Sequence, residues 1–175
     1  MMQNAEEIAR TELIFALKQG DAHMGFDDVL ANFPLEHINT RPPNTGYTFW
    51  HLLEHLRFCQ WDILDYVQNA NYKAAKFLEG YWPQPDEMAD EARWHQTIVA
   101  FKADLEAMVA LIRDEHYDLF TAPPQVWKPH HTPYRCFMVI ADHNAYHLGE
   151  IAILWQVLGL WPVGRVDGWN NVDTL

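Results

Sequence analysis

The chain has 175 residues, 49% of them apolar and 14% aromatic, which is enough material for one globular domain over residues 1–175. Its formal net charge of -12, without a basic patch, argues against nucleic acid and anionic membrane surfaces as partners, because both repel an acidic protein. No apolar run approaches the ~20 residues that span a bilayer, and the first ten residues are too acidic for a secretory signal. Two cysteines are too few for a disulfide framework. We therefore expect a cytoplasmic protein.

The first half of the chain predicts two long helices. A blurred apolar stripe covers residues 4–20, and a shorter helical piece over residues 26–33 stops before Pro34. The second long helix covers residues 48–69 and follows the loop "RPPNTG", with Thr48 as a candidate N-cap. Its apolar stripe alternates steps of three and four through Phe49, Leu52, Leu56, Cys59, Ile63 and Tyr66.

The second half predicts two more long helices. Residues 86–115 carry an unbroken stripe of helical period, formed by Trp94, Ile98, Phe101, Leu105, Met108 and Ile112. The last helix covers residues 132–159. Thr132 is its candidate N-cap, Pro133 occupies the first helical position, and Gly159 marks the end.

The predicted fold class is all-α. No alternating run of valine, isoleucine or threonine is bounded by hairpin turns, so strand signals are nearly absent. Four amphipathic helices joined by loops of very different length predict a four-helix bundle with long crossover loops. Two loops rich in proline and tryptophan, residues 78–88 and 118–133, are expected to cover one end of that bundle.

Histidine is frequent, and two pairs stand one helical turn apart: His51 with His55, and His143 with His147. About 0.6 such pairs are expected by chance among ten histidines, so the number of pairs decides little. Position is more informative, because His143 and His147 interrupt the apolar stripe of the last helix. A buried imidazole must find a partner for each ring nitrogen, and a shared cation satisfies one nitrogen of each ring. Satisfied core histidines are the alternative interpretation.

Several segments resemble the DinB-like superfamily, which also contains bacillithiol-dependent thiol transferases. They are "LLEHLRFCQWDIL", "GYWP", "RWH" and "IADHNAYHLGEIAILWQVLGLWP", in the family's order and over nearly the whole chain. The resemblance implies a four-helix bundle, frequently a homodimer, that holds a divalent metal with one histidine of the second helix and two of the last. Carried over, these ligands are His55, which follows "LLE", together with His143 and His147.

Three neutral imidazoles leave a divalent cation with an open position, as in catalytic metal sites. Zinc and nickel both suit nitrogen ligands. The open position favours activation of a water for hydrolysis or of a thiol for transfer. Glu150 lies at i+3 from His147 on the same helical face and is the candidate general base or supporting carboxylate.

Four more residues could support the site. Asp62, at i+7 from His55, could hydrogen-bond the second ring nitrogen of that histidine, with Glu54 and Asn144 as weaker candidates. Cys59 could reach the pocket, although such a residue is more often a small buried hydrophobe.

His51, one turn before His55, could line the pocket, hydrogen-bond a ligand or act as a fourth nitrogen ligand, but a solvated or packed residue is the favoured interpretation. His130 and His131 precede the last helix in a loop that could cover the site, although surface positions are favoured, and the other histidines are interpreted as ordinary residues.

The sequence therefore predicts a metal-dependent hydrolase or thiol S-transferase that acts on a small molecule, with a low-molecular-weight thiol as the second substrate in the transferase case. The first alternative is a non-catalytic module that binds a metal or small ligand in a stress response. The second is an all-α interaction domain whose histidines hold no metal.

Overall fold

The computed structural model describes residues 4–18, 22–76, 79–124 and 128–161. Within these ranges the chain contains only helices, which confirms the all-α fold class. The long helices are α1 (Ala5–Lys18), α3 (Phe49–Gln68), α4 (Glu91–Arg113) and α5 (Pro133–Val157). The short elements are α2 (Phe26–Leu30) and the 3-10 helix η1 (Leu35–His37), the second of which was not predicted.

The helix ends follow the predicted capping residues. Thr48 accepts a hydrogen bond from the His51 amide at the start of α3, and Thr132 accepts one from the Arg135 amide at the start of α5. At the other end of α5, Gly159 adopts a φ of 68°, a left-handed conformation that glycine reaches without steric cost. The amides of Gly159 and Leu160 donate to carbonyls of the last turn, which completes a Schellman cap.

Helix α4 begins five residues later than predicted. Asp90 is its N-cap and accepts a hydrogen bond from the Arg93 amide, whereas residues 86–89 precede the helix and are not helical. The amide of Ala89, the last of these residues, donates to Asn39 Oδ1 instead of to a helical carbonyl. The acidic residues Asp86 and Glu87 resemble the first turn of a helix, but Asp86 lies in a turn in which the Glu87 amide donates to the Gln84 carbonyl at 2.9 Å.

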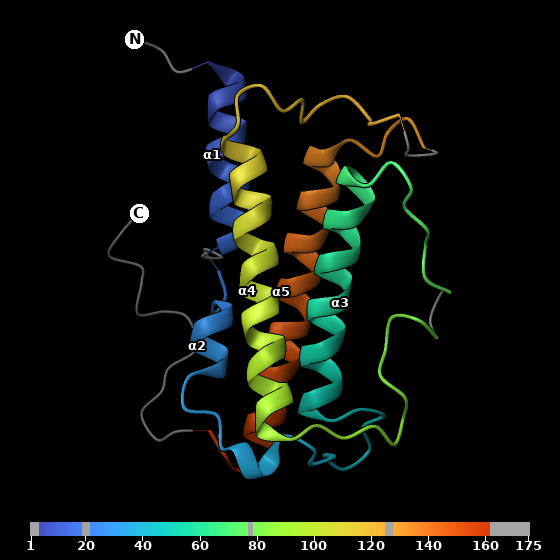
Figure 1. Ribbon diagram of the computed structural model, residues 1–175. Helices are drawn as coiled ribbons and strands as arrows, with labels where there is room; N and C mark the ends of the chain where they lie inside the picture. The colour runs from blue at the N-terminus through green and yellow to red at the C-terminus, as the bar shows by residue number, and fades with distance from the viewer. Residues whose placement is uncertain (1–3, 19–21, 77–78, 125–127, 162–175) are drawn as a thin grey trace.

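The four long helices lie side by side, with α1 and α5 running in one direction and α3 and α4 in the other (Figure 1). The parallel pair α3 and α4 requires a crossover along the length of the bundle, and residues 69–76 and 79–90 belong to it (Figure 1). The loop from α4 to α5 crosses the end of the bundle at which α1 and α5 begin (Figure 1). The expectation that both proline-rich loops cover one end was therefore wrong, because the crossover packs along the side of α3.

Two apolar clusters fill the bundle on either side of a polar layer. The cluster that contains Trp50, Trp94 and Trp155 is separated along the helices from the cluster that contains Met108 and Phe137. Between them, Gln60 is fully buried; its amide donates to the Phe101 carbonyl at 2.6 Å, and Asn144 donates to Gln60 Oε1 at 3.0 Å. Buried amides keep such a layer only where they find partners, so the helices are fixed in register at this level.

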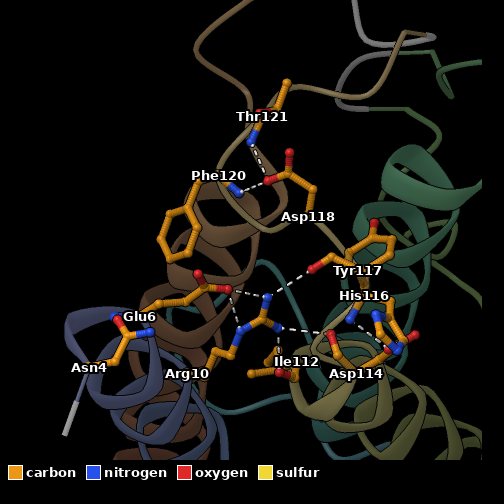
Figure 2. A network of polar contacts seen from close by, with 10 residues as sticks. All are labelled: Asn4, Glu6, Arg10, Ile112, Asp114, His116, Tyr117, Asp118, Phe120 and Thr121. Carbon is orange, nitrogen blue, oxygen red and sulfur yellow. Dashed lines mark hydrogen bonds and ion pairs between the residues drawn. The ribbon is translucent and has the colours of Figure 1, made fainter.

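A second polar network joins α1 to the end of α4. The buried guanidinium of Arg10 points from α1 toward the last turn of α4 and donates to the carbonyls of Ile112 at 2.7 Å, Asp114 at 3.1 Å and Tyr117 at 2.9 Å (Figure 2). The Glu6 carboxylate pairs with the same guanidinium at 2.7 Å. Arg10 thus satisfies carbonyls that a helix C-terminus leaves without an intrahelical partner. None of the helices in the described part of the chain is long and apolar enough to cross a membrane.

Candidate metal centre

His55 lies in the second turn of α3 and is only 6% exposed. Its Nδ1 is 2.7 Å from the carbonyl oxygen of Tyr81 in the crossover, and a carbonyl can only accept, so His55 carries its proton on Nδ1. The indole of Trp82, the next residue of the crossover, stacks on the imidazole at 3.7 Å between ring centroids and 8° between planes. The ring of His55 is therefore held in one tautomer, with the lone pair of Nε2 directed into the bundle.

His147 is held in the same way from α5. Its Nδ1 lies 2.6 Å from Glu150 Oε2, so this nitrogen also donates, and in the neutral ring Nε2 bears the lone pair. The other oxygen of Glu150 accepts a hydrogen bond from the Tyr47 hydroxyl at 2.9 Å. Burial and the hydrogen bond to Glu150 raise the pKa of Tyr47 to about 12, so the phenol remains a donor at neutral pH.

His143 lies one turn before His147 on α5. Its Nε2 is 3.1 Å from the Nε2 of His55. Its Nδ1 is buried and has no hydrogen-bond partner among the described residues. The side chain of Asn144 is a hydrogen-bonding neighbour of His143 and acts to raise its pKa, but this contact is looser than those at Nδ1 of His55 and His147.

The three rings converge on one another. Nε2 of His55 lies 3.1 Å from Nε2 of His147 as well as from that of His143. The tautomers of His55 and His147 direct two lone pairs at each other, which is repulsive without a positive charge between them. A proton on His143 Nε2 can be donated to His55 Nε2, which removes the repulsion between these two rings but not the repulsion between His55 and His147. Two imidazole nitrogens bound to one zinc-like cation at about 2.1 Å lie roughly 3–3.4 Å apart, so the His55–His147 pair and the His55–His143 pair each have the spacing that such an ion requires.

Protonation of His55 or of His143 does not supply a positive charge at neutral pH. Burial is the main reason why the pKa of His55 and that of His143 are each lowered to about 4, and the neighbouring imidazoles lower them further. Both rings are therefore neutral near pH 7, the state in which an imidazole binds a metal.

Cys59 adds a fourth donor at this level of the bundle. Its Sγ lies 3.5 Å from Nδ1 and 3.8 Å from Nε2 of His55, one turn away on α3. Ligand atoms of His55, Cys59 and His143 all lie within 4.8 Å of one another, so this trio could hold a metal ion. His147 is outside that trio, although it contacts His55 directly. Burial, followed by the charge of Asp62, raises the pKa of the Cys59 thiol to about 12, so the sulfur is protonated unless a cation displaces its proton.

The expectation that Asp62 bonds to His55 was wrong. Seven residues span about 10 Å along a helix, too far for the short aspartate side chain, and the Tyr81 carbonyl takes the position beside His55 Nδ1. Asp62 instead accepts hydrogen bonds from the hydroxyls of Tyr72 at 2.8 Å and Tyr81 at 3.0 Å.

The other polar candidates have structural partners. Glu54 pairs with Arg57 at 2.6 Å, and Asn144 donates to Gln60 in the polar layer. His51 is buried by the N-terminus of α3, where its Nδ1 contacts the Thr48 hydroxyl at 2.6 Å and its Nε2 contacts the Gln84 carbonyl at 2.9 Å. Among the interpretations offered for His51, a packed residue agrees with the structure, because the side chain is 3% exposed and both ring nitrogens have partners away from the other three imidazoles. His131 contacts the Tyr66 hydroxyl at 3.0 Å, and His130 is exposed.

Sequence reasoning missed three residues that surround the histidines. Tyr47 and Trp82 lie in connecting segments, and their rings stack with centroids 5.7 Å apart. Tyr81 acts on His55 through its backbone carbonyl, for which no side-chain signal exists. The segment "GYWP" was noted for its resemblance, yet its contact with α3 depends on the path of the crossover.

The comparison with protein families gives one match. The family model described as the DinB superfamily matches residues 21–151, a range that contains all three predicted histidine ligands. No curated protein and no solved structure matches the chain. Because the family model covers well over half of the sequence, and the described residues form the expected all-helical bundle, the chain belongs to the DinB superfamily.

Proposed function

We propose that the protein binds a divalent metal ion, zinc or nickel, through His55, His143 and His147. The observation that carries this proposal is the 3.1 Å contact between Nε2 of His55 and Nε2 of His147, two rings whose protons are committed to oxygen acceptors at Nδ1. Carboxylate and carbonyl acceptors behind metal-bound histidines orient the rings and raise their basicity. Here Tyr81 and Glu150 provide these acceptors.

We further propose that the site supports catalysis on a small molecule. A bound divalent cation would supply Lewis acidity and lower the pKa of a water or thiol that reaches it. The chain's own residues hold the imidazoles in place: Trp82 covers one face of His55, and Tyr47 and Glu150 fix His147. Two reaction classes fit this arrangement, hydrolysis and transfer of a low-molecular-weight thiol, and the second agrees with the thiol transferases of the family that the sequence resembles.

One observation favours the alternative of a non-catalytic binding module. Both oxygens of Glu150 are engaged, one by His147 and the other by Tyr47. Each oxygen thus has one of its lone pairs in use, and the contact with His147 makes Glu150 a supporting carboxylate for that ring. Catalysis would require either another proton acceptor or a change of this role when substrate binds.

Metal content and turnover separate these proposals. Protein purified without chelator and without a histidine tag should contain close to one equivalent of zinc or nickel by elemental analysis, and His55→Ala should lose it. Ester, amide and epoxide substrates are then assayed with and without low-molecular-weight thiols. A rate that disappears in His147→Ala supports the enzyme. A metal-loaded protein that is inert throughout the screen supports the binding module, and wild-type protein without metal supports the interaction domain.

We also propose a homodimer, formed through the outer face of α5. Three exposed residues on this helix repeat at intervals of seven and form one apolar row: Val139, Tyr146 and Ile153, which are 43%, 66% and 51% exposed. The charged residues on this face are Arg135 and Asp142, whose charges balance, and Glu150, whose carboxylate contacts Tyr47 and His147. In a chain of net charge -12, an apolar face of low net charge is where a second copy can approach with little repulsion.

A further inference from the structure

Asp62 is a buried carboxylate whose role is not explained by the packing of α3. It is 7% exposed, and its two oxygens accept from two phenols of the crossover, Tyr72 at 2.8 Å and Tyr81 at 3.0 Å. Burial raises its pKa, while the two phenol hydrogen bonds lower it. A buried carboxylate is costly unless its hydrogen bonds are made, so the position of both phenols is tightly coupled to Asp62.

The contact with Tyr81 continues to the metal centre. The Tyr81 side chain donates to Asp62, and the Tyr81 carbonyl accepts the Nδ1 proton of His55 at 2.7 Å. Residues 69–76 and 79–90 contain no helix or strand, so no secondary structure fixes where this carbonyl lies. Asp62 and His55 stand on the same helix, and Tyr81 spans the two turns between them.

We propose that Asp62 is a positioning residue for His55. By holding the hydroxyl of Tyr81, it keeps the carbonyl of that residue against His55 Nδ1, so that the imidazole retains the tautomer with its Nε2 lone pair directed into the bundle. The consequence for metal affinity rests on the proposed function. The effect on the tautomer does not, because it is a property of the metal-free protein.

Two matched substitutions test the proposal. Tyr81→Phe and Tyr72→Phe each remove one hydroxyl that donates to Asp62, but only Tyr81 carries the carbonyl that His55 contacts. Asp62→Asn is the third variant, because the amide keeps one acceptor oxygen and replaces the other with an NH2 group, to which a phenol cannot donate. If Asp62→Asn fails to fold, the pair of phenylalanine variants still decides the question.

The first measurement is the tautomer of His55 in protein from which a chelator has removed any metal. Imidazole ¹⁵N chemical shifts report the tautomer, and the His55→Gln variant assigns the signals of His55. We expect the wild type and Tyr72→Phe to hold the proton on Nδ1, and Tyr81→Phe and Asp62→Asn to populate both tautomers. The second measurement is zinc affinity by competition with a chromophoric chelator. We expect a loss of roughly tenfold to a hundredfold in Tyr81→Phe and Asp62→Asn, the range seen when a residue behind a metal ligand is removed, and a change below about threefold in Tyr72→Phe.

Three results would overturn the proposal. A His55 tautomer unchanged in Tyr81→Phe shows that Asp62 does not act through this carbonyl. Equal effects of Tyr72→Phe and Tyr81→Phe show that both hydroxyls merely hold the crossover in place. A tautomer that shifts without any change in zinc affinity removes the functional role. If the wild type itself binds neither zinc nor nickel, the proposed function fails, whereas the tautomer comparison still tests the positioning of His55.

Discussion

Nε2 of His55 lies 3.1 Å from Nε2 of His147, although each ring donates its Nδ1 proton to an oxygen, the Tyr81 carbonyl in one case and the Glu150 carboxylate in the other. Two lone pairs thus face each other across the interface between α3 and α5. This arrangement costs free energy in a metal-free protein, and a cation that binds both nitrogens recovers it. We therefore expect metal binding to stabilise the fold as well as to create a reactive site.

The first prediction concerns metal content. His55→Ala and His147→Ala should each lose stoichiometric zinc or nickel, measured by elemental analysis after purification without a tag. His95→Ala is the control, because His95 is exposed on α4 and should leave the metal content unchanged. Wild-type protein that contains no divalent metal, and takes up none on dialysis against zinc, would contradict the prediction.

The second prediction separates His147 from Cys59 as the third ligand. The lone pair of His147 is already directed at the site by Glu150, whereas the Cys59 thiol, with a pKa raised to about 12, must first lose its proton. We expect His147→Ala to weaken zinc binding by more than about 100-fold, and Cys59→Ala by less than about tenfold. The reverse order, or a thiolate-to-metal charge-transfer band in the cobalt-substituted protein that Cys59→Ala abolishes, would assign the ligand to the cysteine.

How much of this site could be predicted from the sequence depends on the distance over which each residue acts. The helices and their caps are local features, so apolar period together with Thr48, Thr132 and Pro133 located three of the four long helices closely. The two histidines of α5 were accessible for the same reason, because residues four apart share one face.

Contacts that depend on the crossover could not be predicted. The acceptor behind His55 is a backbone carbonyl 26 residues away, and a carbonyl has no sequence signature. The start of α4 was misplaced because residues 86–89 have the composition of a first helical turn. In the structure they form the end of a turn and a non-helical segment in which Ala89 contacts Asn39. Asp62 shares a helical face with His55, but its carboxylate accepts hydrogen bonds from the phenols of Tyr72 and Tyr81 instead.

The third prediction is a loss of stability of the metal-free protein in weak acid. The folded-state pKa of His55 and of His143 is about 4, below the 6.5 of an unfolded chain, so the unfolded state binds protons first as the pH falls. This contribution to stability is fully present above pH 6.5 and is lost between pH 6.5 and about 4, with a slope approaching roughly 1.4 kcal/mol per pH unit for each ring. Urea titrations at pH 7, 6 and 5 measure it.

The control for this pH effect is His55→Gln, which cannot titrate. Its free energy of unfolding should fall less steeply with decreasing pH than that of the wild type. The comparison of slopes is needed because burial raises the pKa of Asp62, and a raised carboxyl pKa opposes the acid effect of the histidines. Parallel pH profiles of the two proteins would show that His55 is protonated equally in the folded and unfolded states.

The fourth prediction concerns the Arg10 network of Figure 2. Arg10→Ala leaves the carbonyls of Ile112, Asp114 and Tyr117 without their charged donor, and we expect it to lower the free energy of unfolding by about 2–4 kcal/mol. Glu6→Gln is the matched control, because it removes only the half-exposed partner of the same guanidinium and should cost less than about 1 kcal/mol. Zinc affinity should be unchanged in both variants, since the network lies at the far end of α4 from the metal centre. An equal cost of the two substitutions would show that the ion pair, and not the carbonyl contacts, anchors α1.

The fifth prediction tests the apolar row of α5. Tyr146→Glu places a charge in the middle of the row, and burial of that charge between two copies should weaken the dimer by roughly 100-fold, or about 2.7 kcal/mol. Val99→Glu on α4 is the control, because Val99 and Tyr146 are equally exposed, at 66%, on different helices. Sedimentation velocity over a range of protein concentrations should show a dimer for the wild type and Val99→Glu, and a monomer for Tyr146→Glu. A monomeric wild type, or equal dissociation of the two variants, would place the row among ordinary surface residues and leave the metal centre to act within a single copy of the chain.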